Sequence, residues 1–101
     1  MHFRQGDVLI KKVRSIPNGL KREEPEERIV LAYGEVTGHA HAIHELENVD
    51  VFVGDGRMYL RVKDHVTLWH EEHSAIVLPP GNYERVIQRE YQPDQIRQVM
   101  D

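Results

Sequence analysis

Six of the seven histidines lie between residues 39 and 73, and their spacing indicates metal chemistry. Imidazole is a common ligand of divalent transition metals, because its neutral ring offers a nitrogen lone pair. The stretch GHAHAIHE spans residues 38–45. On a β-strand alternate side chains share a face, so His39 and His41 would point the same way and His44 the opposite way. Same-face neighbours lie roughly 6–7 Å apart, which lets two imidazoles bind one ion through bonds of ~2.0–2.1 Å.

Further candidate ligands are one glutamate and a second pair of histidines. Glu45 shares the face of His41, but it reaches the same ion only if the strand bends or bulges. The stretch HEEH begins at His70 and ends at His73. These two side chains become neighbours at a turn or on one helical turn. The ligands expected from the residue pattern are therefore His39, His41, Glu45, His70 and His73.

The available donors limit which metals fit. The chain contains no cysteine, which excludes disulfides, thiolate zinc sites and cysteine nucleophiles. A site of histidines and carboxylates suits zinc, iron, manganese, nickel or copper. Two histidines and one carboxylate in a facial arrangement would leave coordination positions open for a substrate. Glu71 and Glu72, inside HEEH, are candidates for hydrogen bonds that fix the imidazole tautomers.

Composition excludes several classes of protein. A formal charge of −4 gives no electrostatic reason to expect nucleic-acid binding. The N-terminal stretch MHFRQGDVLI lacks the apolar segment of a secretory leader, and no apolar run approaches the roughly 20 residues that span a bilayer. The absence of cysteine is compatible with a reducing compartment. We therefore expect a cytoplasmic protein without membrane contact.

The elements that must position these residues read as short strands. Turn signals such as Asp55-Gly56 separate them, and no helical stretch suggests a βαβ unit. The polar residues 17–28, interrupted by Pro25, predict an exposed, mobile loop. Residues 92–101 fit either a short helix or a tail docking on a neighbour, and Trp69 is expected in the core or an interface. Strands are predicted at residues 7–13, 28–33, 49–56, 57–62, 65–69, 74–78 and 82–91. Seven or eight short strands are typical of a small all-β barrel or sandwich, here a single domain over residues 1–101.

Two of these motifs resemble those of the cupins. The stretch GEVTGHAHAIHE is similar to the first cupin motif, in which a glycine precedes a His-x-His pair and a glutamate follows. The PPG at residues 79–81 looks like the core of the second motif. The resemblance implies a small double-stranded β-barrel with a metal bound inside, and His39, His41 and Glu45 as ligands. Glu84 stands where the second motif supplies a histidine, so the resemblance leaves Glu84, His70 and His73 as alternatives for the fourth ligand. The chain also resembles a group of short uncharacterised bacterial and phage proteins, which adds no function.

Three hypotheses of function follow from these observations. The first is a metal-binding β-barrel whose ion, zinc, iron, manganese or nickel, acts on a small organic substrate. The second is a non-catalytic module in which the histidines and a metal hold a homo-oligomer or a partner interface together. The third needs no metal and uses the imidazoles as a proton-sensing or general acid–base set. Metal content separates the first two from the third, and the effect of a chelator on molecular mass separates the first from the second.

Overall fold

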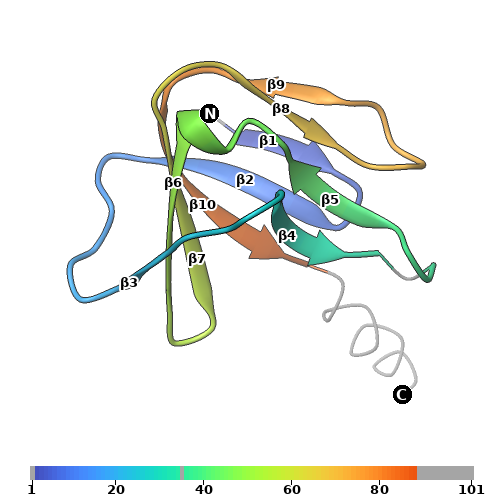
Figure 1. The fold of residues 1–101 in the computed structure, drawn as a ribbon. Helices are drawn as coiled ribbons and strands as arrows, with labels where there is room; N and C mark the ends of the chain where they lie inside the picture. Colours follow the sequence, from blue (N-terminus) through green and yellow to red (C-terminus); the bar gives the residue numbers. More distant parts are fainter. Residues whose placement is uncertain (1, 35, 89–101) are drawn as a thin grey trace.

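The computed structural model describes residues 2–34 and 36–88. These residues form antiparallel strands and one turn of 3-10 helix (Figure 1). The strands are β1 (His2–Gln5), β2 (Val8–Val13), β3 (Lys21–Glu23), β4 (Ile29–Tyr33), β5 (Ala40–Ile43), β6 (Val49–Gly54), β7 (Arg57–Val62), β8 (Val66–Trp69), β9 (Ile76–Leu78) and β10 (Gly81–Ile87), and the helical turn is η1 (Leu46–Asn48). No helix among the described residues is long and apolar enough to cross a membrane.

Hydrogen bonding joins the strands into two antiparallel sheets. One has six strands in the order β1-β2-β10-β7-β6-β3, and the other has four in the order β4-β5-β8-β9. The expected all-β class is confirmed. Within the described residues the strands form two separate sheets and not one closed barrel. One hydrophobic core contains residues of both sheets, so the sheets pack face to face.

The core is formed by fully buried aliphatic side chains of both sheets. Val8 and Ile10 on β2 and Leu60 on β7 belong to the six-stranded sheet, and Leu68 on β8 joins them from the four-stranded sheet. Burying one such side chain stabilises the fold by about 1.5–3 kcal/mol. Tyr83 on β10 is also buried, and its hydroxyl donates a hydrogen bond to the Pro79 carbonyl. This bond ties the proline corner between β9 and β10 to the sheet.

Strand β5 is buried on both faces, and its two faces differ in size. His41 and Ile43 face the interior, where Ile43 joins the core. Ala40 and Ala42 occupy the alternate positions and are 3% and 2% exposed. Their methyl groups are small, so the side chains on the outer face of β5 project less far from the sheet than those on the strands beside it. Ala40 and Ala42 therefore leave space for a groove over β5.

Two strands lie where the sequence predicted none. β1 precedes the first predicted strand, and β3 lies inside the segment 17–28 that was predicted as a loop. All three side chains of β3 are exposed, so its pairing with β6 leaves no hydrophobic signal. Besides the backbone pairing, Arg22 on β3 donates to the Asp50 carboxylate on β6 at 2.9 Å. The helix or tail predicted at 92–101 lies outside the described residues.

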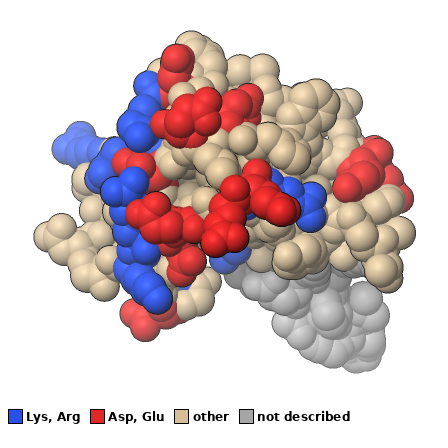
Figure 2. Space-filling model, in the orientation of Figure 1, with Lys and Arg blue, Asp and Glu red and all other residues tan. Residues whose placement is uncertain are grey.

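Three connections meet at one end of the sandwich. They are the turn between β1 and β2, the loop between β4 and β5, and the loop between β8 and β9, all on the right of Figure 1. On the face shown in Figure 2, acidic side chains lie at this end, while Lys and Arg gather on the left, intermixed with Asp and Glu. The histidines of the sequence motifs belong to these connections and to the strand ends beside them.

Candidate metal centre

Four imidazoles gather where these connections meet, with His70 in the middle. The ring centre of His70 lies 4.3 Å from that of His41, 4.7 Å from that of His73 and 5.8 Å from that of His39. The His41 and His73 rings are 6.0 Å apart and nearly parallel. Two imidazoles on one ion have ring centres about 4.5–5.5 Å apart, given bonds of ~2.0–2.1 Å. The His70–His73 separation lies in this range, and the other three lie within about 0.5 Å of it, so small side-chain shifts would give a shared coordination site.

Strand pairing brings the two sequence motifs together. Ala42 pairs with Trp69 and Ile43 with Leu68, which places the start of β5 beside the end of β8. His41 lies on β5, whereas His39 precedes the strand and His70 follows β8. The sequence analysis expected His39 and His41 on one face of the same strand, but in the structure only His41 is on the strand. Each of them contacts His70 from a different position.

His41 is held by a buried glutamine that sequence reasoning missed. Both side chains are 2% exposed, and His41 Nδ1 lies 2.8 Å from Gln5 Oε1. The Gln5 amide nitrogen donates to the carbonyls of Leu68 and Ser74, each at 2.9 Å, which identifies Oε1 as the acceptor. His41 Nδ1 therefore carries the proton and donates it to Gln5. The lone pair of the ring is on Nε2, as in a metal-ligating histidine whose other nitrogen donates a hydrogen bond.

The closest potential ligand atoms belong to His39, His70 and Glu71. One donor atom of each lies within 4.8 Å of the other two. Two donors on one ion are about 3.0–3.5 Å apart, so side-chain shifts of little more than about 1 Å would close the set. His39 Nδ1 is buried without a hydrogen bond among the described residues. It lies 3.3 Å from a Glu72 carboxylate oxygen, near enough for an ion pair but not aligned for a hydrogen bond.

The electrostatics of the cluster favour the metal-binding protonation states. Burial lowers the pKa of His70, and the nearby His73 lowers it further, so the neutral ring is favoured. The Ala40 amide donates to Glu71 Oε1 at 2.9 Å and lowers the pKa of that carboxyl, which keeps it ionised. The Glu72 amide donates to His70 Nδ1 at 3.0 Å. Glu71, predicted as a hydrogen-bonding partner, is thus also a candidate ligand.

Two glycines leave room for the rings. A Cβ atom on Gly6, in the turn between β1 and β2, would lie 2.7 Å from His73 Nε2. A Cβ on Gly34, after β4, would lie 3.1 Å from His70 Nε2. Real Cβ atoms almost never approach a neighbour as closely as 2.7 Å, so the His73 ring needs a glycine at position 6. Gly6 carried no sequence signal that linked it to the histidines, whereas Gly34 opens the stretch GEVTGHAHAIHE.

We expect Gly6→Ala to displace the His73 ring and to destabilise the protein by about 1–2 kcal/mol. Gly6 has a φ of +59°, a conformation that costs a residue with a Cβ roughly 1 kcal/mol before the collision is counted. Thermal unfolding measures the stability, and the ring signals of His73 in NMR spectra report its displacement. Gly19→Ala is the matched control, because Gly19 also has a positive φ but nothing near its Cβ position. Equal NMR spectra of the His73 ring in both variants would contradict the expected contact.

Two other sequence candidates lie outside the cluster. The Glu45 carboxylate, beyond the end of β5, accepts the Thr67 amide at 3.3–3.4 Å. Glu84 is on β10 of the other sheet, where its carboxylate lies 3.9 Å from Arg57. The structure therefore brings together His39, His41, His70 and His73 and leaves both glutamates elsewhere. Exposed His44 lies on the opposite face of β5, as predicted.

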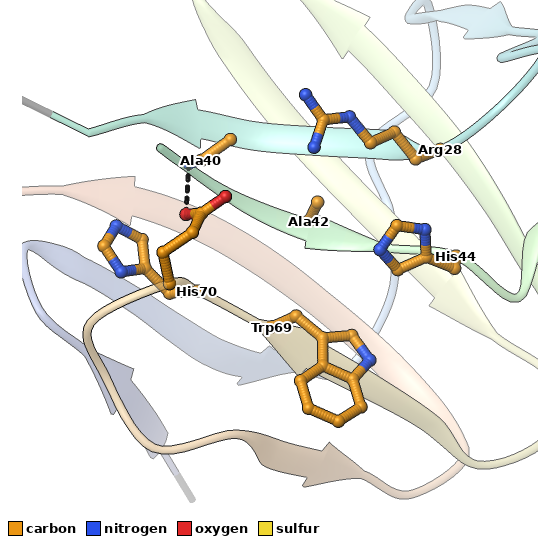
Figure 3. Close-up of a pocket in the computed structure, with 7 residues that line it drawn as sticks. Arg28, Ala40, Ala42, His44, Trp69 and His70 are labelled. Carbon is orange, nitrogen blue, oxygen red and sulfur yellow. Dashed lines mark hydrogen bonds between the residues drawn. The ribbon is translucent and has the colours of Figure 1, made fainter. Parts of the chain in front are cut away.

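A groove runs along the outer face of the four-stranded sheet and ends at the cluster. It encloses about 280 Å³ and is lined by Arg28, Ala40, Ala42, His44, Trp69, His70 and Glu71. Figure 3 shows the Arg28 guanidinium and the Trp69 indole on opposite sides of Ala42. Trp69 is 50% exposed, so of its two predicted positions the core is wrong, and an interface stays a prediction. The alanines of β5 form the floor because they are smaller than the side chains around them.

Comparison with known proteins identifies a family without a described activity. A family model described as a domain of unknown function (DUF8820) matches residues 4–88. The match covers all the residues of the cluster and of the groove. No curated protein and no solved structure matches the chain.

Proposed function

The chain belongs to the family described as a domain of unknown function (DUF8820), and we propose from its site geometry that it binds one divalent transition metal ion. The observation that carries the proposal is the gathering of four imidazoles, from β5 and two separate loops, with His70 in the middle. His41 is buried and His39 and His70 are half-buried, so these imidazoles have lost part of their hydration, which a shared cation would offset. Zinc, iron, manganese and nickel all accept this set of donors.

His39, His70 and Glu71 are the residues that would hold the ion. The buried Nδ1 of His39 would gain the partner that it lacks among the described residues. His41 and His73, packed on the His70 ring, are the next donors and would complete the set. A bound ion would supply Lewis acidity, and His70 and Glu71 also line the outer groove. A small organic molecule in that groove could therefore approach the ion directly.

We also propose that the fold is related to the double-stranded β-barrel of the cupins. It is supported by the two antiparallel sheets that share one core, and by a histidine cluster built on the His-x-His stretch. The ligand set differs from the one that the cupin motif implies. Here the carboxylate is Glu71 of the second histidine stretch, while Glu45 contacts the Thr67 amide.

The test is metal content measured on untagged protein, together with one backbone NMR signal. We expect about one ion per chain after purification or after zinc addition, because a site of this kind binds tightly at neutral pH. The Glu72 amide donates to His70 Nδ1, so binding at His70 must alter that hydrogen bond. Its NMR signal should shift with zinc and stay unchanged with magnesium, which prefers oxygen ligands. A chain that takes up no transition metal, and whose Glu72 amide is insensitive to zinc, would refute the proposal.

A metal-stabilised homo-oligomer is the second candidate. The observation in its favour is a group of exposed apolar side chains on the four-stranded sheet: Tyr33 at 65%, Trp69 at 50% and Val77 at 55% exposure. Light scattering with and without a chelator distinguishes the two functions. An unchanged mass supports the site within one chain, and a fall in mass on chelation supports the interface.

A further inference from the structure

The groove on the outer face of β4, β5 and β8 holds a positive charge, the Arg28 guanidinium. Arg28 precedes β4 and is half-buried at the edge of the groove. Among residues 2–34 and 36–88, no carboxylate lies within ion-pair distance of its guanidinium. Ile29 pairs with Ile43, so Arg28 and His44 flank that pair and stand at the same end of the groove. A half-buried guanidinium beside an imidazole fits a carboxylate, which it can bind through two hydrogen bonds.

The middle of the groove is shaped for a flat ring. Ala42 pairs with Trp69 across the two strands, so the indole stands directly beside a methyl group. Half of the Trp69 surface is exposed, although an indole is among the side chains that gain most from burial. Figure 3 shows the indole along one side of the groove and Arg28 along the other. A planar ring lying over Ala42 would contact both the indole and the guanidinium.

The size and the far end of the groove limit the ligand further. A volume of about 280 Å³ is at the small end of ligand pockets, which suits a molecule with one ring. The end opposite Arg28 is formed by His70 and Glu71. A molecule anchored by its carboxylate at Arg28 would extend its ring and any substituent toward these two residues.

We propose that this groove binds a small planar carboxylate, and that such carboxylates are the substrate class presented to the metal centre. The first part rests on Arg28, Ala42 and Trp69 alone. The second part rests on the proposed metal function, because only a bound ion at His70 and Glu71 would meet the far end of the ligand. The two parts can fail separately, and the experiment keeps them apart.

Trp69 is the only tryptophan of the chain, so its fluorescence reports directly on the groove. Benzoate added to the full-length protein should change the emission in a saturable way. Benzyl alcohol has the same ring without the charge and should bind at least about tenfold more weakly, the loss expected from one ion pair of about 1.4 kcal/mol. Arg28→Gln should weaken benzoate binding by a similar factor. Arg14→Gln, which removes an exposed arginine outside the groove, should leave it unchanged.

Ala42→Leu tests the floor of the groove, because a leucine side chain would fill the space over β5. It should abolish the response to benzoate, and the circular dichroism spectrum shows whether the variant folds. If Ala42→Leu does not fold, Arg28→Gln provides the test of benzoate binding, since a change at the groove edge leaves the core intact. Benzoate and benzyl alcohol binding equally well, or neither binding, would overturn the inference. Trp69 emission that depends on protein concentration and ignores benzoate would overturn it too, in favour of a second copy of the chain as the occupant.

Zinc separates this inference from the proposed function. Benzoate should bind the chelated protein, and zinc should tighten its binding. A protein that binds zinc but not benzoate refutes the groove and leaves the metal site intact. A protein that binds benzoate and takes up no metal supports the groove and refutes the metal centre. Zinc and benzoate that bind without affecting each other overturn the second part of the inference alone.

Discussion

His70→Ala is expected to lower the affinity for zinc by more than about 100-fold and to leave the purified chain almost free of metal. Its ring is in the middle of the cluster, with three other imidazoles around it at 4.3–5.8 Å. Removing a hydrogen-bonding partner of a metal ligand already costs about 10–100-fold in affinity, so removing the central ligand should cost more. Elemental analysis and a competition titration with a coloured chelator measure the loss.

Matched substitutions separate this effect from a general loss of structure. His65→Ala removes another histidine from an exposed position outside the cluster and should retain the metal. Glu71→Gln and Glu72→Gln make the same chemical change at adjacent positions. Both side chains are exposed, but only the Glu71 carboxylate is in the close donor group. Metal affinity should fall more for Glu71→Gln. Equal metal content in the wild type and His70→Ala would refute the assignment of His70 as the central ligand.

Local patterns in the sequence predicted the elements that depend on neighbouring residues. The strand at 57–62 was predicted with the bounds it has as β7, because the Asp55-Gly56 hairpin turn precedes it. For His70 and His73 the sequence left open a turn or one helical turn as the way in which they become neighbours, and the structure has a bend at residues 71–73. Those features are determined by residues a few positions apart.

Local sequence patterns could not predict contacts between segments that are far apart in the chain. Gln5 and His41 are 36 residues apart, and Gln5 lies on β1, a strand of four residues whose hydrophobic pattern is too short to recognise. The partner of His41 depends on how β1 packs against β5 and β8, which belong to the other sheet. The same limit explains Glu45, which lies near His41 in the sequence. Its carboxylate contacts the Thr67 amide because β5 pairs with β8 and ends before it.

Gln5 offers the sharpest test of how the cluster is held, because its amide serves three partners at once. Gln5→Met keeps the approximate volume but leaves His41 Nδ1 without an acceptor and the carbonyls of Leu68 and Ser74 without this donor. An unsatisfied buried polar group costs about 1–3 kcal/mol, and we expect a loss of unfolding free energy in that range. Affinity for zinc should fall about 10–100-fold, as for other partners of metal-ligating histidines. Gln88→Met makes the same change at a half-buried position after β10 and should alter neither quantity.

Gln5→Glu separates the two roles of the amide. A carboxylate still accepts the proton of His41 Nδ1, but it cannot donate to the two backbone carbonyls. Gln5→Glu should therefore keep the His41 tautomer and most of the zinc affinity while losing stability. Gln5→Met should lose the tautomer, the zinc affinity and the stability. Nitrogen NMR of the imidazole distinguishes the tautomers, because a protonated Nδ1 and an unprotonated one resonate far apart. If Gln5→Met kept the proton of His41 on Nδ1 and kept its zinc affinity, Gln5 would be a structural residue of the core, with no part in orienting the imidazole.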